Sequence, residues 1–281
     1  MCISLLQILF ILEILLQILK VTLLSQERIC EMAIKAKSQR LLLALLPDDT
    51  REQSFVSVEQ IQMLFPNLSA TGFRSLVSHL ERKGLLHHER VGRRSQLYLS
   101  ELGKMTLFDL FPGLDPRRKD WTGNWSCLVF QDAPASDKQF RYLRRSLVEL
   151  RAIPLTRGVY LYPGQYPVTF IEQSRKLYAG AISIFSIGTI QFGSLRPIVI
   201  EKGELKTLQE LYSGISNEAV QLLSQIDDTA SLTDQQKDRF ASLFDRYVSL
   251  LRGDIGLGSY YFPDETWGSI VLQELRAIVL L

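Results

Sequence analysis

The chain has 281 residues, of which 46% are hydrophobic, and a formal net charge of +2 at pH 7. This length predicts about two domains, or three small ones, with enough apolar side chains for packed cores. The nearly neutral charge excludes nucleic-acid binding through bulk charge, so any such affinity must come from a local basic patch.

Residues 1–31 form a hydrophobic N-terminal segment. Between Ile3 and Leu24 the mostly apolar run is interrupted by Gln7, Glu13, Gln17 and Lys20. It lacks the basic start and the small-residue cleavage site of a signal peptide. About sixteen apolar side chains favour membrane insertion by roughly 8 kcal/mol, but the polar residues cost several kcal/mol, so the balance is marginal. Three interpretations stay open: a translation start at Met32 that makes the segment an artefact, a membrane anchor, or an amphipathic partner helix.

Residues 32–112 are predicted to form a helical module with a β-hairpin. A leucine-rich helix over residues 35–46 is closed by Pro47. A second helix, capped by Ser54 or Ser57, contains the apolar residues of 58–65 and ends at Pro66-Asn67. This spacing leaves a short turn before the next helix, as in a helix-turn-helix.

The stretch from Ser69 to Gly84 predicts the third helix of this module. Ser69 and Thr71 are both candidate N-caps, and Gly84 is suited to end the helix. Phe73, Leu76, Val77 and Leu80 share one face. The opposite face carries small and basic residues that suit close approach to a phosphate backbone and to base edges, namely Gly72, Arg74, Ser75, Ser78 and Arg82.

A basic hairpin is predicted to follow. Residues 85–91 and 96–99 have strand character, and Gly92-Arg93-Arg94-Ser95 forms the tip between them. The order of elements predicts a winged helix-turn-helix that binds double-stranded DNA. Its candidate DNA-binding residues are Ser69, Thr71, Arg74, Ser75, Ser78, Arg82, Arg93 and Arg94. The alternative is an ordinary amphipathic helix beside a solvated hairpin.

Residues 120–200 predict a small α+β domain, after a linker at 111–116 and the basic run of 117–119. Strands are expected at 125–131, 158–163 and 181–187, and helices at 137–151 and 168–178. Strand–helix–strand followed by helix–strand indicates a ferredoxin-like fold.

Residues 204–281 predict a C-terminal helical domain. Amphipathic stripes occur at 205–212, 219–226 and 235–251, and a last helix begins near Thr266-Trp267. Thr233 and Gln236 are spaced for a capping box. The fold class is therefore α+β, with a winged helix-turn-helix, a ferredoxin-like domain and a helical domain.

No catalytic constellation stands out, and we expect no enzyme activity and no cofactor. A G-x-S-x-G elbow, a Walker A loop and paired Rossmann glycines are absent from the sequence. Cys2, Cys30 and Cys127 are too scattered for a disulfide framework or a zinc site, which favours a reducing, cytoplasmic location. Cys127 is expected in a core. His79, His87 and His88 lack ligand partners at suitable spacing, so surface or phosphate-facing roles are expected.

Several motifs after the hairpin resemble the PaaX family of transcriptional repressors. They read W-x-G-x-W-x-x-x-x-F, R-x-x-L-R-x-x-L and G-V-Y-x-x-P, followed by a shortened C-terminal F-P-D…W-G. The residues are Trp121, Gly123, Trp125, Phe130, Arg141, Leu143, Arg144, Leu147, Gly158, Val159, Tyr160, Pro163, Phe262, Pro263, Asp264, Trp267 and Gly268. The resemblance covers roughly residues 32–281. It departs from the family at His79, where an arginine is usual, and at Ala152-Ile153, where Gly-Phe is usual.

The resemblance implies a dimer that binds operator DNA and is released by an acyl-CoA or other small-molecule effector. It also implies a middle domain similar to a small CRISPR-associated nuclease, in which Asp132 would stand at the metal-binding position. Metal-dependent nuclease activity is therefore an alternative, although an Asp that ends a strand before a proline is usually a turn residue. A membrane-tethered sensor or scaffold is the other alternative, if residues 1–31 are retained.

Overall fold

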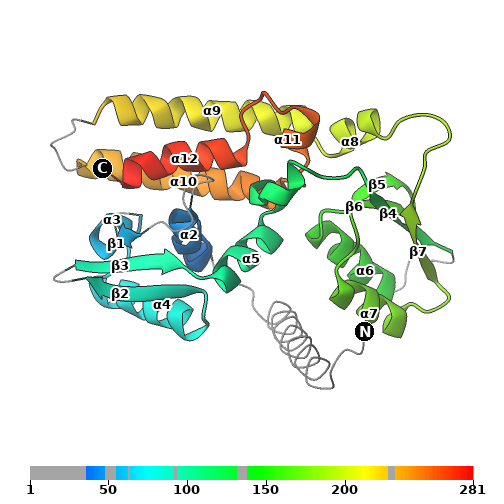
Figure 1. Ribbon diagram of the computed structural model, residues 1–281, viewed down its shortest axis with the longest axis horizontal. Helices are drawn as coiled ribbons and strands as arrows, with labels where there is room; N and C mark the ends of the chain where they lie inside the picture. The colour runs from blue at the N-terminus through cyan, green and yellow to red at the C-terminus, as the bar shows by residue number, and fades with distance from the viewer. Residues whose placement is uncertain are drawn as a thin grey trace, which may run out of the picture. The chain divides into compact units, whose positions relative to one another are not determined.

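The computed structural model describes residues 36–47, 55–62, 64–91, 94–131, 138–226 and 232–280. The chain divides into two compact units, residues 1–39 and 40–281. The second unit combines helices with two small antiparallel sheets (Figure 1), which confirms the predicted α+β class. The expectations for residues 1–31 lie outside the described residues. None of the helices in the described ranges has the length and apolar content that crossing a bilayer requires.

The C-terminal half of helix α2 (Ala36–Leu45) is enclosed because residues 41–45 are all apolar. The side chains of residues 41–46 are at most 6% exposed. At the start of this run, Arg40 donates from Nη1 to the carbonyl of Leu64 at 2.7 Å and forms an ion pair with Asp245. The predicted leucine-rich helix is therefore confirmed, and one arginine connects it to two other elements.

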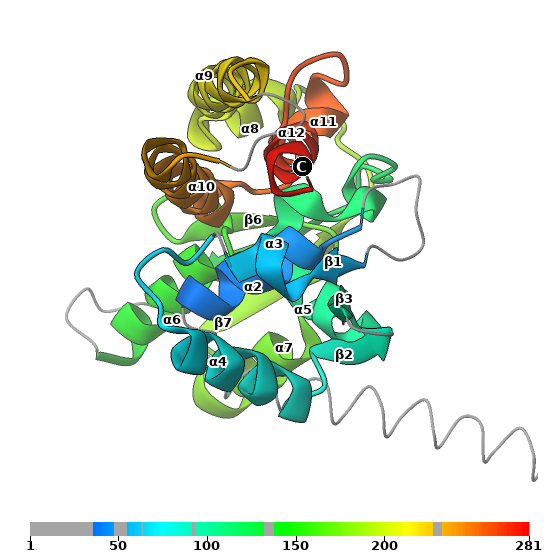
Figure 2. The same ribbon diagram turned by 90° about the vertical axis from the view of Figure 1, so that its left-hand side faces the viewer.

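A three-stranded sheet with two helices follows α2. Its elements are β1 (Val56–Ser57), α3 (Val58–Gln62), α4 (Ala70–Arg82), β2 (Leu86–Val91) and β3 (Arg94–Leu99). The strand order is β1-β3-β2, and α4 packs on β2. Figure 2 shows α4 on the outside of this part of the chain, with β2 and β3 beside it. The two-residue strand β1 was not predicted, because its pairing with β3 is non-local.

Two exchanged hydrogen bonds begin α3 at the predicted place. The amide of Gln60 donates to Ser57 Oγ at 3.1 Å, and the amide of Ser57 donates to Gln60 Oε1 at 3.2 Å. This is the geometry of a capping box. Ser57 therefore fills the predicted role, whereas Ser54 lies outside the described residues.

The predicted linker is packed against the rest of the chain. Helix α5 (Glu101–Leu110) precedes it, and two short turns, η1 (Pro112–Leu114) and η2 (Pro116–Arg118), run through it. Phe111 and Leu114 are buried, at 1% and 6% exposure. Of the predicted basic run, Arg117 pairs with Asp115 and Arg118 donates to the carbonyl of Pro163 at 3.0 Å.

The second sheet has four strands. Its elements are β4 (Trp125–Phe130), α6 (Lys138–Glu149), β5 (Ile153–Thr156), β6 (Val159–Pro163), α7 (Val168–Leu177) and β7 (Ile182–Ile187), with strand order β5-β6-β4-β7. Helices α6 and α7 cover one face around Leu128, Leu143 and Phe170. Strand β5 was not predicted, because it is short and contains Pro154, which argues against a strand.

The C-terminal part is helical, as predicted. Its elements are α8 (Arg196–Lys202), α9 (Leu205–Ser224), α10 (Asp234–Gly253), α11 (Gly258–Tyr261) and α12 (Gly268–Val279). The two stripes expected at 205–212 and 219–226 belong to one continuous helix, because Ile215 carries the buried face across the gap. The capping box of Thr233 and Gln236 is confirmed.

Candidate nucleic-acid interface

The rotation of α4 is fixed by its cap and by its apolar face. Ser69 Oγ accepts a hydrogen bond from the amide of Gly72 at 3.1 Å, so Ser69 is the N-cap. Thr71, the other candidate, lies inside the first turn. Phe73, Val77 and Leu80 are buried below α4. The opposite face of the helix is therefore held outward.

That outward face carries the residues that the sequence predicted. Thr71, Arg74, Ser75, Ser78 and Arg82 are all exposed, and we call them the α4 polar stripe. Their spacing of three or four residues places them along one side of the helix. Gly72 departs from the prediction, because a Cβ there would lie 2.9 Å from Cδ1 of Leu68. It contributes close packing rather than surface.

The two arginines of the α4 polar stripe are held against their own helix by one nitrogen each. Arg74 Nε donates to the carbonyl of Ala70 and Arg82 Nε to that of Ser78, both at 3.3 Å. Neither arginine forms an ion pair with a carboxylate in the described part of the chain. Their terminal nitrogens can therefore bind an external anion such as a phosphate.

The second strand of the hairpin is longer, and the tip is shorter, than the sequence predicted. Val91 pairs with Arg94, so two residues, 92 and 93, connect the strands. Arg94 is the first residue of β3 and does not belong to the tip, because the ladder continues two pairs further than strand propensity indicated. Gly92, Arg93 and the side chain of Arg94 lie outside the described residues.

Strand β2 adds a cation that the sequence analysis missed. His87, His88, Glu89 and Arg90 are all exposed, and Arg90 pairs across the ladder with Ser95. The charged run within a strand pattern was the available signal for Arg90. Glu89 accepts a hydrogen bond from the Tyr98 hydroxyl at 2.6 Å, which raises the pKa of Tyr98. The carboxylate nearest to Arg90 in sequence is thus engaged with a tyrosine.

No metal centre accompanies this surface in the described residues. Groups of three or more His, Cys, Asp or Glu that could hold an ion are absent there. Asp132 lies outside the described residues. Cys127 was expected in a core, but its side chain is half-buried, because it faces away from α6 and α7; burial raises the pKa of its thiol.

A buried junction ties the end of α5 to the other parts of the second unit. Arg151, in the turn between α6 and β5, donates from Nη2 to the carbonyl of Leu110 and from Nε to that of Arg252, the latter at 2.8 Å. Its φ of 59° is in the left-handed region, which costs energy for a residue other than glycine. The contacts that Arg151 makes there offset this strain.

Asp254 is the carboxylate of this Arg151 junction. It is 2% exposed, accepts from the amide of Gly256 at 2.7 Å and accepts from the Tyr212 hydroxyl at 3.1 Å. Burial raises the pKa of Asp254, while these hydrogen bonds and the charge of Arg151 act in the opposite direction. A Cβ at Gly113 would lie 2.1 Å from Asp254 Oδ2, so only glycine fits at that position of the linker.

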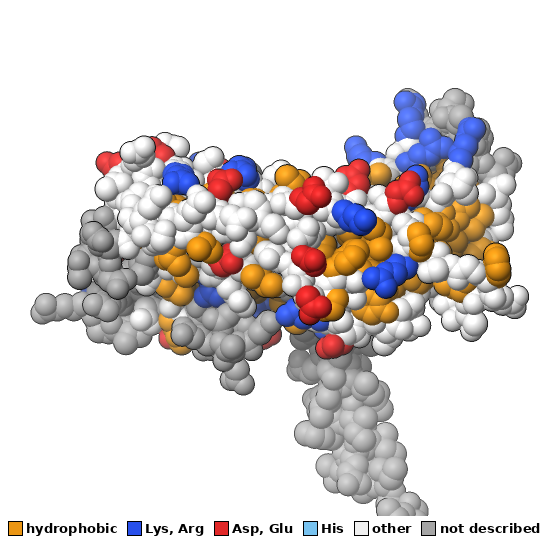
Figure 3. Space-filling model, turned by 90° about the horizontal axis from the view of Figure 1, so that it is seen from above, with side chains coloured by type: hydrophobic (Ala, Val, Ile, Leu, Met, Phe, Trp, Pro, Cys, Tyr) orange, Lys and Arg blue, Asp and Glu red, His pale blue; other side chains and the backbone are white. Residues whose placement is uncertain are grey.

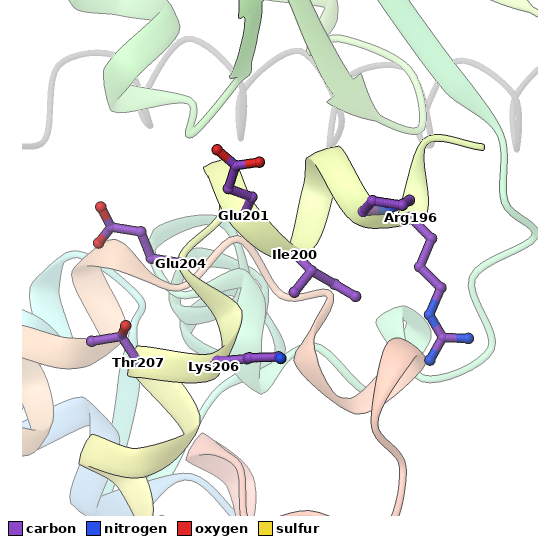
Figure 4. Close-up of a pocket in the computed structure, with 7 residues that line it drawn as sticks. Arg196, Ile200, Glu201, Glu204, Lys206 and Thr207 are labelled. Atoms are coloured by element: carbon purple, nitrogen blue, oxygen red, sulfur yellow. The ribbon is translucent and has the colours of Figure 1, made fainter. Parts of the chain in front are cut away.

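Two pockets lie elsewhere in the second unit. The larger, about 610 Å³, is lined by α8 and the start of α9. Figure 4 shows Glu201 and Glu204 on the opposite side of this pocket from the guanidinium of Arg196, which donates to the carbonyl of Tyr261 at 3.2 Å. The smaller, about 240 Å³, is lined by residues of α5, η1 and α12, among them Phe108, Leu114 and Leu272.

Several of the residues that carry the family resemblance serve packing. The ring of Trp121 meets Trp125 at 4.8 Å and Tyr260 at 5.0 Å between centroids. Leu143 and Leu147 lie in the core of the four-stranded sheet. Trp267 lies against Gly258, where a Cβ would approach its ring to 2.2 Å. These positions maintain the fold and supply no reactive group.

Comparison with known proteins identifies no family. No family model matches the chain, and no curated protein matches it. Among solved structures, the chain is similar to the uncharacterized protein Rv0674 from Mycobacterium tuberculosis, with 17% identity and a TM-score of 0.39, over 89% of this chain and 100% of that chain. A likeness this weak says nothing about function.

Proposed function

We propose that this protein is a sequence-specific DNA-binding transcriptional regulator whose DNA-binding domain, called the reading head below, is a winged helix-turn-helix. The observation that carries the proposal is the α4 polar stripe, which is held outward by a buried apolar face beside a hairpin with exposed charges. Helix, strand, two helices and two strands follow one another, and the strand order is β1-β3-β2. This arrangement suits a helix in the major groove with a wing beside it.

In this proposal, α4 enters the major groove and the hairpin contacts the backbone or the adjacent minor groove. Ser75 and Ser78 are short donors and acceptors that can approach base edges, while Arg74 and Arg82 can bind phosphates or guanine. Arg90, Arg93 and Arg94 supply the charge of the wing. Because the net charge is only +2, binding depends on these few cations.

The four-stranded sheet supports a ferredoxin-like middle domain. Numbering its strands one to four along the chain gives the spatial order 2-3-1-4, with a helix after the first strand and another after the third. This is the split βαβ arrangement. We propose that the whole chain is organised like a PaaX-type repressor, which acts as a dimer on a palindromic operator.

A small-molecule effector is the remaining part of the proposal. The pocket of about 240 Å³ touches α5, which follows the hairpin directly, so a ligand there could alter the reading head. Its volume is below the range of about 300–1,000 Å³ for drug-sized ligands, which favours a small effector over an acyl-CoA. The pocket of about 610 Å³ is within that range, but its lining combines Glu201 and Glu204 with Arg196 and Lys206, so it has no net positive charge to attract a polyphosphate.

The test is selection of bound sequences from random duplex DNA with the full chain, followed by titration of the selected duplex at several salt concentrations. We expect the double variant Arg74→Ala/Arg82→Ala to lose about 100-fold in affinity. Arg145→Ala is the control, because Arg145 is also an exposed arginine but lies on α6. The affinity of this variant for the selected duplex should be unchanged. Equal affinity of the double variant and the wild type, or no enrichment of any sequence, would overturn the proposal.

A further inference from the structure

The two sheets have four edge strands, and three of them are protected against pairing with another strand. Exposed edges are usually blunted by short length, charge, proline, irregular register or a covering element. Strand β1 has two residues. Strand β2 carries exposed Glu89 and Arg90. Strand β5 contains Pro154, has a register irregularity after it, and is contacted by α8.

Within the described residues, the fourth edge, β7, carries none of these devices. Its sequence is ISIFSI, and the longer stretch from Gly180 to Leu195 contains no charged residue and no proline. Phe185 is 53% exposed, and Phe192, in the segment after β7, is 98% exposed. Figure 3 shows hydrophobic side chains gathered over the right-hand end of the second unit, where this sheet lies. Interfaces between proteins have this composition, depleted of charge and enriched in aromatics.

The backbone of β7 offers a regular row of hydrogen-bonding groups. The amide of Gln131 donates to the carbonyl of Ala181 at 2.9 Å, so Gln131 and Ala181 form a hydrogen-bonded pair. Hydrogen-bonded and non-hydrogen-bonded pairs then alternate along the ladder between β4 and β7. Residues 181, 183, 185 and 187 therefore direct their peptide groups toward β4. Ile182, Ile184 and Ser186 direct theirs outward, away from the sheet.

We propose that this edge pairs with β7 of a second copy of the chain, in antiparallel register about a two-fold axis at Ile184. Ile184 then faces Ile184 of the second copy, and Ile182 faces its Ser186, in pairs of the hydrogen-bonded kind. The three outward residues of each copy supply about six hydrogen bonds. The result is a continuous eight-stranded sheet.

A second copy fits this edge better than a different strand for two reasons. The outward peptide groups of residues 182, 184 and 186 are evenly spaced about Ile184, so a two-fold axis there pairs each with one of the second copy, as an isologous interface requires. On the face away from α6 and α7, Phe185 lies opposite Ser183 of the second copy and diagonal to its Phe185, within reach of aromatic side chains. Because β7 is uncharged, no like charges oppose each other.

The inference rests on the dimer that the proposed function includes, but it is tested without DNA. Sedimentation of the full chain measures the dimer dissociation constant. Ser186→Pro removes an outward amide donor and leaves the ladder to β4 intact. Because each copy loses one hydrogen bond across the interface, we expect the dimer dissociation constant to rise about 100-fold. Ser186→Ala keeps the donor and should remain a dimer.

A second variant keeps the test decisive if Ser186→Pro does not fold. Phe185→Lys places two like charges at diagonal positions on an exposed site, and it should yield folded monomers, whereas Phe185→Leu should stay a dimer. A wild-type monomer at micromolar concentration, or a dimer that survives both Ser186→Pro and Phe185→Lys, would overturn the inference. Weak binding of a single operator half-site by the monomeric variants would support both the interface and the reading head. Loss of DNA binding by the wild-type dimer would count against the reading head alone.

Discussion

The two sheets of this protein expose opposite kinds of surface. The hairpin of β2 and β3 presents His87, His88, Glu89 and Arg90 to solvent. The edge strand β7 presents Phe185 and uncharged neighbours. Strands β2 and β7 both lie at the edge of an antiparallel sheet.

The difference indicates two kinds of partner. A charged edge resists pairing with another strand and suits a solvated polyanion, whose counterions it displaces. An uncharged edge suits a second strand, whose peptide groups and apolar side chains it can match. We therefore assign DNA to the first sheet and a second copy to the other, and the predictions below test whether the surfaces are as distinct as proposed.

The largest expected effect separates the buried face of α6, which covers the four-stranded sheet, from its exposed face. Leu143, on α6, is 1% exposed, so Leu143→Ala should lower the free energy of unfolding by about 2–5 kcal/mol, through lost burial and a cavity. Val148, on the same helix, is 69% exposed, and Val148→Ala should change the free energy of unfolding by less than about 0.5 kcal/mol. Urea unfolding measures both. Similar effects at the two positions would show that the helix-covered face is not the core.

The next effect concerns the start of α4. Ser69→Ala removes the side chain that accepts from the amide of Gly72, and should cost about 1 kcal/mol of stability. Thr71→Ala is the matched control, because Thr71 lies within the first turn and caps nothing. Thermal unfolding distinguishes the two. A larger loss at Thr71 would mean that the helix begins later than Ser69.

The α4 helix also shows how much the sequence could predict. Its apolar spacing, its cap at Ser69 and its end before Gly84 (φ 69°) are local properties, and the structure bears them out. Strand β1 was missed because its partner β3 is distant in sequence, and β5 because it is short and contains Pro154. The exact length of the hairpin tip depended on ladder pairing, which strand propensity describes poorly.

The candidate site was predicted only where one helix face carries it. Exposure of the α4 polar stripe followed from helical periodicity. Arg151 and Asp254 could not be found in this way, because they are far apart in sequence and meet only in the folded chain. The unprotected edge of β7 likewise requires the strand order, since the sequence alone does not say which strand lies at a border.

A smaller effect tests the polar surface of the hairpin. Arg90→Ala should weaken DNA binding about fivefold and reduce the salt slope by about one, because one phosphate contact is lost regardless of sequence. Arg157→Ala, at an exposed arginine in the turn between β5 and β6, is the control. Fluorescence anisotropy over a salt series measures both. If only Arg157→Ala weakened DNA binding, the four-stranded sheet and not the hairpin would be the DNA-binding surface.

The smallest effect is a pH dependence at the Arg151 junction. Burial raises the pKa of Asp254 in the folded chain, so the folded state binds this proton more tightly than the unfolded chain does. The free energy of unfolding should therefore fall as pH rises from about 4, the ordinary pKa of an aspartate, to the raised value. Asp254→Asn cannot titrate, and its stability should lack this decline.

The wild type minus Asp254→Asn difference isolates the carboxylate. Arg151, Tyr212, Tyr247 and the amide of Gly256 act on Asp254 in the wild type, and they remain in the variant. Asp109, whose pKa burial also raises, titrates in both proteins and cancels. Urea unfolding from pH 4 to 8 supplies the two curves. A difference that grows in favour of the wild type with rising pH would mean that the charge of Arg151 outweighs burial, and that the junction is held by an ion pair.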